Sequence, residues 1–174
     1  MRTQAAAPSA RPSPAKPSMV PPVLDELPFR LDVGFDRLYG LQVTEVGEGV
    51  MRATVDVRDA IKQPAGLVHG GIYAAIAESL ATTGTALAVI GDGYTAMGLS
   101  NQTSFLRPVT EGSIHACARV RHRGRTTWVW EVEMSDDAQR LCVLTRMTIA
   151  VREAPKGAVG APGSGAPASP GSGS

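Results

Sequence analysis

Four segments of the chain alternate apolar and polar side chains with the period of a β-strand. They span residues 51–57, 114–121, 128–134 and 141–149; the first, for example, places Met51, Ala53 and Val55 on one side. Such alternation predicts strands with one buried face. Pairs typical of turns precede or separate the last three segments, namely Glu111-Gly112, Arg123-Gly124 and Asp136-Asp137. These three strands are therefore expected to form an antiparallel meander.

Residues 71–90 follow a different pattern. They read GIYAAIAESLATTGTALAVI, which is rich in alanine and has neither proline nor alternation. This composition predicts one long helix. Its length would suit a membrane span of about 20 residues, but its polar residues and few large aliphatics favour a helix wrapped by the sheet. We therefore expect an α+β protein in which an antiparallel sheet covers one central helix, away from any membrane.

Composition divides the chain into one folded domain and two tails. Residues 1–24 are rich in Pro, Ala and Ser and residues 154–174 in Gly, Pro, Ala and Ser, so both are predicted to be disordered. Residues 25–153 then form a single domain. The net charge of +1 gives no reason to expect a nucleic-acid partner. Cys117 and Cys142 are interpreted as buried free thiols, which indicates a reducing, cytoplasmic location.

Glu78 is the only side chain in the predicted helix that is charged at neutral pH. A carboxylate among apolar side chains is unfavourable unless it is paired, neutralised or functional. It could lie on an exposed stripe or pair with an arginine of the sheet. Thr82, however, follows four residues later on the same helix face and could hydrogen-bond the carboxylate or a water beside it. Glu78 is therefore a candidate catalytic residue.

Two glycines, Gly70 and Gly71, stand immediately before or within the first turn of this helix. They could simply form a tight turn. They also allow close backbone approach and leave N–H groups at the positive end of the helix dipole, which suits an oxyanion or a polarised carbonyl. Gly70 and Glu78 lie about 12 Å apart along the helix axis. If they act on one carbonyl, a second copy of the chain must supply one of them.

Two further polar residues precede the helix. His69 could be a general base, but a structural role or a ligand contact is favoured. Gln63 could donate an amide hydrogen bond to a carbonyl, although a single glutamine is weak evidence. His115 and His122 have no spacing that would build a metal site with His69, so neither a metal nor a cofactor is expected.

The string GLVHGGIYAAIAESLAT resembles the motif of hotdog-fold thioesterases of the phenylacetate-pathway and 4-hydroxybenzoyl-CoA family, most of all the actinobacterial type. Further matches, such as Arg107-Pro108-Val109 and Thr126-Thr127-Trp128, extend the resemblance over residues 33–152. It implies hydrolysis of an acyl-CoA thioester, with an aromatic acyl group like that of 4-hydroxybenzoyl-CoA, to free acid and CoA. Alternatives are a broader phenylacetyl- or medium-chain thioesterase, a non-catalytic acyl-CoA-binding module and a hotdog dehydratase, whose catalytic His and acid spacing is absent.

The resemblance also implies roles for residues. Glu78 matches the nucleophile or general base, and Thr82 the residue that positions the water or the carboxylate. The N–H of Gly70, assisted by Gln63, matches the group that polarises the thioester carbonyl. His69 matches a position near the pantetheine arm.

For the CoA nucleotide, the resemblance implies phosphate contacts from Arg107 and Thr126. Arg125 replaces a small hydroxyl residue beside Thr126. Pro155 occupies the place of a basic residue that helps to hold CoA, which Arg152 or Lys156 could replace. Members of this family form dimers, usually paired into tetramers, with each site across a dimer interface.

Overall fold

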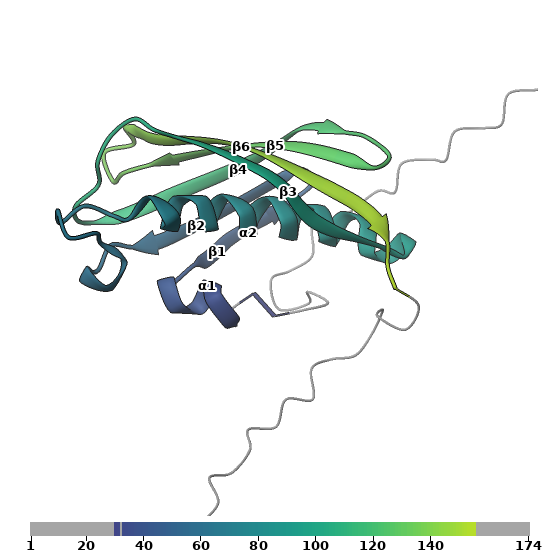
Figure 1. The fold of residues 1–174 in the computed structure, drawn as a ribbon, viewed down its shortest axis with the longest axis horizontal. Coiled ribbons are helices and arrows are strands. Elements are labelled where there is room, and N and C mark those ends of the chain that lie inside the picture. The colour runs from purple at the N-terminus through teal and green to yellow at the C-terminus, as the bar shows by residue number, and fades with distance from the viewer. Residues whose placement is uncertain (1–29, 32, 156–174) are drawn as a thin grey trace, which may run out of the picture.

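The computed structural model describes residues 30, 31 and 33–155. Within them, two α-helices and six strands follow one another, with short 3-10 turns at Asp59–Ile61 and Ile90–Asp92 (Figure 1). The elements are α1 (Gly34–Tyr39), β1 (Gln42–Gly47), β2 (Val50–Asp56), α2 (Gly70–Val89), β3 (Tyr94–Phe105), β4 (Ser113–Arg123), β5 (Thr127–Ser135) and β6 (Leu141–Glu153). The predicted tails lie almost entirely outside the described residues.

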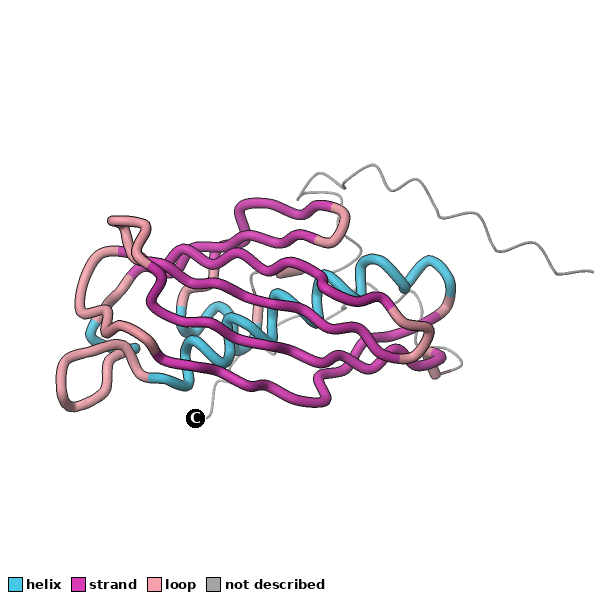
Figure 2. The backbone as a smooth tube through the Cα atoms, turned by 90° about the horizontal axis from the view of Figure 1, so that it is seen from above, coloured by secondary structure: helices cyan, strands magenta, loops and turns pink. Residues whose placement is uncertain are grey.

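All six strands form one antiparallel sheet in the order β1-β2-β4-β5-β6-β3. The long helix α2 runs along one face of this sheet, as both views show (Figures 1 and 2). This arrangement is the hotdog fold, and it confirms the expected fold class. Strands β1 and β3 are the two edges of the sheet.

The core lies between α2 and the facing side of the sheet, and its centre is the fully buried Trp130. The indole Nε1 donates to Thr85 Oγ1 at 2.9 Å, and Thr85 in turn donates to the carbonyl of Ala81 at 2.8 Å. Gly84 allows the helix to approach, because a Cβ at that position would lie 2.7 Å from the Trp130 ring. Close packing at Gly84 and the hydrogen bond between Trp130 and Thr85 therefore fix the helix against β5.

The alternation correctly predicted β2 and the meander β4-β5-β6, and the predicted helix differs from α2 by one residue at each end. Two details were wrong. Leu141, expected in the core, is 40% exposed at the start of β6. Cys117 is only half-buried, because it points outward from β4 with the polar positions of that strand, while Cys142 is buried as expected. Elements α1, β1 and β3 were not predicted.

The segment Gly70–Asp92 is long and apolar enough, with a mean hydropathy of 1.4, to meet a length-and-composition test for a membrane span. In this fold the helix packs against the sheet, and residues including Ile76, Ala77 and Leu80 are buried in the core. This packing buries 33% of the most apolar 18-residue stretch of the helix.

Candidate active site

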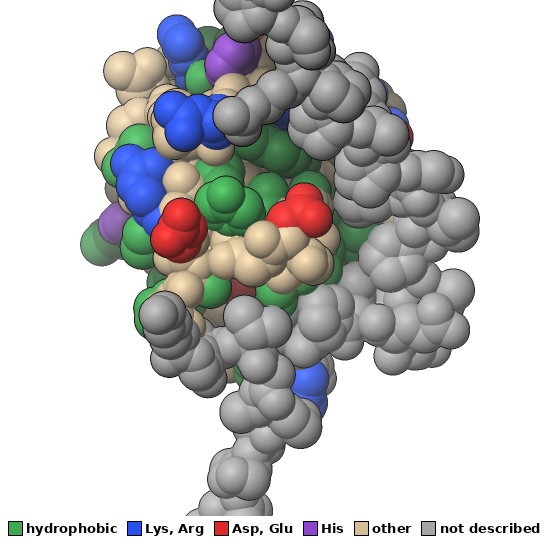
Figure 3. Space-filling view, turned by 90° about the vertical axis from the view of Figure 1, so that its right-hand side faces the viewer, with side chains coloured by type: hydrophobic (Ala, Val, Ile, Leu, Met, Phe, Trp, Pro, Cys, Tyr) green, Lys and Arg blue, Asp and Glu red, His purple; other side chains and the backbone are tan. Residues whose placement is uncertain are grey.

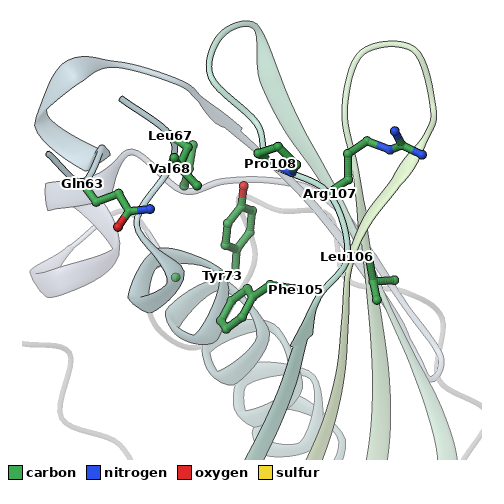
Figure 4. Close-up of a pocket in the computed structure, with 9 residues that line it drawn as sticks. Gln63, Leu67, Val68, Tyr73, Phe105, Leu106, Arg107 and Pro108 are labelled. Atoms are coloured by element: carbon green, nitrogen blue, oxygen red, sulfur yellow. The ribbon is translucent and has the colours of Figure 1, made fainter. Parts of the chain in front are cut away.

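A pocket of about 440 Å³ opens at the N-terminal end of α2 (Figure 4). It is bounded by the loop before α2, the first turn of α2 and the segment that follows β3. The lining residues are Gln63, Leu67, Val68, Gly70, Tyr73, Phe105, Leu106, Arg107 and Pro108. The structure thus brings three residues predicted from the sequence, Gln63, Gly70 and Arg107, to one pocket.

The loop before α2 is held by its own backbone. The N–H of Gln63 donates to the carbonyl of Leu67 at 2.9 Å, and the carbonyl of Gln63 accepts from the N–H of Gly66 at 2.9 Å. Gly66 has a φ of +84°, in the left-handed region that glycine adopts without strain. His69 N–H then donates to Ile61 O at 2.9 Å. This tight loop fixes Gln63 beside the start of α2.

His69 is the N-cap of α2, and its Nδ1 accepts a hydrogen bond from Gly71 N–H at 2.9 Å. Because Nδ1 is the acceptor, a neutral ring carries its proton on Nε2. His69 therefore caps α2, and its expected position near the pantetheine arm stays a prediction. The N–H of Gly70 donates to no acceptor among the described residues, and it lies at the positive end of the helix dipole. It is available to a substrate carbonyl.

Phe105 covers Gly70. A Cβ placed on Gly70 would lie 3.0 Å from Phe105 Cζ, so even an alanine would push the ring by a few tenths of an ångström. The same ring packs on Tyr73, with centroids 6.1 Å apart. Phe105 is nevertheless 60% exposed at the end of the edge strand β3. The sequence analysis did not identify Phe105 or Tyr73, although a single tyrosine one turn after Gly70 in an alanine-rich helix was a usable signal.

Glu78 lies outside this pocket, on the exposed side of α2. Its Oε1 accepts from Thr82 Oγ1 at 2.9 Å, which confirms the expected pairing on one helix face. A Cβ on Gly98 of β3 would lie 3.2 Å from the same oxygen. The carboxylate is thus held between its own helix and the edge strand, and no described arginine pairs with it.

Strand β3 runs antiparallel along α2, so that contacts between them follow in order. Phe105 lies over Gly70, Asn101 Nδ2 donates to Ala74 O at 2.9 Å, and Gly98 lies against Glu78. The two ends of this series carry the two groups of the predicted reaction, the Gly70 N–H and the Glu78 carboxylate. They are separated by about two helical turns. A single chain does not bring Gly70 and Glu78 together.

The residues predicted to bind CoA phosphates also lie apart. Arg107 follows β3, where its N–H donates to Cys142 O at 3.0 Å. Arg125 and Thr126 form the turn between β4 and β5, and Arg152 Nη1 donates to Thr126 O at 2.9 Å. Cys142 and Arg152 are at opposite ends of β6, about 30 Å apart. Figure 3 shows the end of the molecule with this turn, where basic side chains gather on one side.

The structure therefore supports Arg152 as a neighbour of Arg125 and Thr126, while Lys156 lies outside the described residues. Among residues 30, 31 and 33–155, no three His, Cys, Asp or Glu side chains cluster as metal ligands.

A polar network holds α1 onto α2 next to Glu78. Asp36 Oδ1 accepts from Tyr39 Oη and from Ser79 Oγ, each at 2.6 Å. Burial, together with the hydrogen bond to Asp36, raises the pKa of the Tyr39 hydroxyl well above its ordinary value. Tyr39 thus remains a hydrogen-bond donor, and the network fixes the residue that follows Glu78.

Residues 65–143 match the thioesterase superfamily, and the chain belongs to this family of thioester hydrolases. A Mycobacterium tuberculosis protein named as a candidate esterase, Rv1847, is 39% identical over 117 residues, which is 66% of this chain and 83% of that protein. The 1,4-dihydroxy-2-naphthoyl-CoA hydrolase of Listeria monocytogenes is 30% identical over 70% of this chain and 98% of its own length.

Solved structures agree with the fold. The thioesterase PA1618 of Pseudomonas aeruginosa superposes with a TM-score of 0.72 at 29% identity, over 80% of this chain and all but 1% of that one. The structure of Rv1847 gives a TM-score of 0.68 at 36% identity, over 71% of this chain and 99% of that one. These similarities establish the reaction class, thioester hydrolysis, and leave the acyl group and the role of each site residue open.

Proposed function

We propose that this thioesterase hydrolyses an aromatic acyl-CoA to the free acid and CoA. The observation that carries the proposal is the free Gly70 N–H in a pocket lined by the Tyr73 and Phe105 rings. Flat apolar walls suit an aryl group, and the one N–H suits a carbonyl oxygen. The Listeria relative, which is named for an aryl-CoA substrate, supports the same choice.

In this reaction the Gly70 N–H donates to the thioester oxygen and stabilises the charge that develops there. Glu78 then acts in one of two ways. It attacks the carbonyl carbon, expels CoA thiolate and forms a mixed anhydride that water opens, or it takes a proton from the attacking water. In either case the thiolate leaves and is protonated. Gln63 assists at the carbonyl, and Thr82 holds the carboxylate.

The Gly70 N–H and the Glu78 carboxylate come together if two copies of the chain pair along β3. This strand is a sheet edge with a free row of backbone groups, and it exposes Met97 and Leu99. An antiparallel pair centred on Gln102 sets Leu99 opposite Phe105 of the partner subunit and leaves Gly98 next to that position. Neighbouring strands lie about 4.8 Å apart. Since Gly98 contacts Glu78 and Phe105 covers Gly70, this register brings Glu78 next to Gly70 of the partner subunit.

Arg107 lies far from Arg125 and Thr126 within one chain. A site formed by two or more chains can contain Arg107 of one chain and Arg125 and Thr126 of another. The proposed assembly is a homodimer, or dimers paired into a tetramer, with CoA phosphates bound by these three residues. Arginine suits this task because its planar group donates paired hydrogen bonds to phosphate oxygens.

A thiol-release assay tests the proposal with benzoyl-CoA, phenylacetyl-CoA and octanoyl-CoA. We expect the highest kcat/KM with an aromatic thioester and a loss of kcat of about 10³-fold in Glu78→Gln. Glu133→Gln, on the outer face beside Arg119, is the matched control. Faster turnover of octanoyl-CoA would indicate the broader thioesterase instead, and acyl-CoA binding without thiol release would indicate the non-catalytic module.

A further inference from the structure

Strand β3 contains an interior glycine, Gly98, that its backbone conformation does not explain. A glycine within a strand is unfavourable relative to alanine, and it usually marks a bulge or a close approach of another group. Six other glycines of the described chain have φ values in the left-handed region, and Gly98 is not among them. An alanine would therefore adopt the same backbone conformation, and the reason for a glycine lies in its surroundings.

The side chain that a β-carbon on Gly98 would meet is that of Glu78. Apart from its neighbours in the chain, the three nearest heavy atoms are Glu78 Oε1 at 3.2 Å, Cγ at 3.6 Å and Cδ at 3.9 Å. A contact at 3.2 Å is tight enough that one of the two groups would have to move by a few tenths of an ångström. The missing side chain thus makes room for the Glu78 carboxylate.

A bulge in β3 turns Gly98 toward α2. The pairing of β3 with β6 skips Leu99, which is the extra residue of the bulge. Gly98 and Phe105 are seven residues apart, an odd number, so regular alternation would place them on opposite faces of the sheet. The extra residue reverses the alternation, and both residues therefore lie against α2. The bulge is thus part of the arrangement that sets the edge strand against the carboxylate.

Both the helix and the strand are held in place on either side of this contact. Asn101 Nδ2 of β3 donates to the carbonyl of Ala74 in α2 at 2.9 Å. Next to Glu78, Ser79 Oγ donates to Asp36 Oδ1 of α1 at 2.6 Å. Because these bonds hold the two elements, a side chain at position 98 would displace the carboxylate rather than the strand or the helix.

The two oxygens of the Glu78 carboxylate have different surroundings. Oε1 accepts from Thr82 Oγ1 at 2.9 Å and lies against Gly98. Oε2 accepts no hydrogen bond from any residue in the part of the chain that the structure describes. Oε1 is thus held by the helix and by the edge strand, and Oε2 is the oxygen that remains available.

We infer that Gly98 is a positioning residue. Its missing side chain lets Glu78 Oε1 lie between Thr82 and β3, and this placement directs Oε2 toward the thioester or the attacking water. The inference rests on the proposed catalytic role of Glu78, and it holds for any acyl group. It also means that the strand gives up stability at this position in return for turnover.

The test replaces Gly98 by alanine and compares turnover with stability. Since a misplacement of about 1 Å lowers a rate about 100-fold, a few tenths of an ångström should lower kcat about 10-fold. KM should change little, because Gly98 contacts Glu78 rather than the remote parts of the substrate. The melting temperature should be equal to or above that of wild type, because alanine is favoured over glycine in a strand.

Gly91→Ala is the matched control. Gly91 is exposed, its φ lies outside the left-handed region, and a β-carbon there would meet no atom within 4 Å. This variant should keep the wild-type kcat and KM. All variants are assayed with whichever of benzoyl-CoA, phenylacetyl-CoA and octanoyl-CoA the wild type hydrolyses fastest.

Crystal structures of wild type and Gly98→Ala give a second readout that does not depend on turnover. Glu78 Oε1 should move relative to Thr82 Oγ1, while β3 keeps its place. Light scattering should give the same mass for both proteins, because position 98 faces the helix of its own chain.

The inference is overturned if Gly98→Ala keeps the wild-type kcat or melts at a lower temperature than wild type. A lower mass would also overturn it and assign Gly98 to subunit pairing, as would a displaced β3 beside an unmoved carboxylate. These results leave the proposed function standing as long as Glu78→Gln is inactive. Normal turnover in Glu78→Gln would instead defeat the proposed role of Glu78, and this inference with it.

Discussion

The two edges of the sheet are built in opposite ways. Strand β1 is six residues long, contains an irregularity between Val43 and Glu45, and carries the Glu45 carboxylate 2.9 Å from Arg52. Strand β3 is twelve residues long, has no charged side chain, and leaves Met97 50% and Leu99 56% exposed. Short length, bulges and charges protect an edge from pairing. Strand β1 has all three, and β3 lacks the first and the last, so β3 is the edge suited to a second copy.

The arginines also fall into two groups, those with an acidic partner and those without one. Those on the outer face of β4 have acidic partners: Arg121 pairs with Glu131, and Arg123 Nη1 lies 3.0 Å from Glu48. Arg107 and Arg125 form no ion pair with any described residue. The paired arginines stabilise a solvated surface, whereas the other two are free to bind an anionic ligand.

The largest effect is expected from a charge on the β3 edge. Met97→Lys should produce monomers and lower kcat/KM by more than about 100-fold, because each Glu78 loses the partner's carbonyl-polarising group. Light scattering and the thiol-release assay measure the two effects, with circular dichroism to confirm the fold. Thr44→Lys, an exposed position on β1, is the matched control and should change neither. Equal behaviour of the two variants would remove the distinction between the edges.

Arg107→Ala should raise KM about 10-fold and change kcat little, because a phosphate contact remote from the reacting carbon contributes to ground state and transition state alike. Arg121→Ala, on the outer face, should leave KM unchanged. The difference should shrink with an acyl-pantetheine substrate and at high salt. If Arg107→Ala impairs the full and the nucleotide-free thioester equally, Arg107 has a structural role.

Tyr39→Phe should lower the free energy of unfolding by about 1–2 kcal/mol, since a buried hydroxyl loses the Asp36 acceptor. Tyr73→Phe removes a hydroxyl with no partner and should not lower it. Urea denaturation of both variants measures the difference. Similar losses in the two variants would show that the hydrogen bond to Asp36 does not account for the loss in Tyr39→Phe.

The smallest effect concerns the turn between β5 and β6, which holds none of the proposed site residues. Hydrogen bonds from the Arg140 guanidinium and N–H lower the pKa of the Asp136 carboxyl below its ordinary value. Its stabilisation is therefore complete above the unfolded pKa, about 3.9, and is lost as the pH falls through the folded one. Asp136→Asn should destabilise the protein at pH 7 and approach wild type below about pH 4. A pH-independent difference would exclude this ion pair as its cause.

The sequence predicted the strands that have one buried and one exposed face, and it missed the strands whose two faces have similar exposure. In β4 to β6 the inner positions are buried and the outer ones are polar, which produces clear alternation. In β3 nearly every position is exposed in the single chain, and in β1 the irregularity at Val43 interrupts the period. Helix α1 has only six residues, too few for a helical period to be visible.

The site was predictable to a similar extent. A carboxylate alone in an alanine-rich helix made Glu78 a candidate, and helix spacing predicted its hydrogen bond with Thr82, which the structure shows. The distance between Gly70 and Glu78 predicted a second chain if both groups act on one carbonyl. Gly98 was missed because its role depends on the atoms that a side chain there would meet, and only a three-dimensional structure shows them.

The central claim is that Glu78 of one subunit acts with Gly70 of the other across β3, and mixing two inactive variants tests it most directly. Glu78→Gln lacks the carboxylate. Gly70→Pro lacks the N–H at a helix position that accepts proline, and Gly70→Ala, which keeps the N–H, controls for the displacement of Phe105.

Refolded together, Glu78→Gln and Gly70→Pro should form mixed dimers in which one of the two sites is intact, with about half the wild-type activity per mixed dimer. Each variant alone should stay inactive, and the Gly70→Ala protein should be more active than Gly70→Pro. Mixed dimers demonstrated by mass spectrometry but without any recovered thiol release would contradict the shared site.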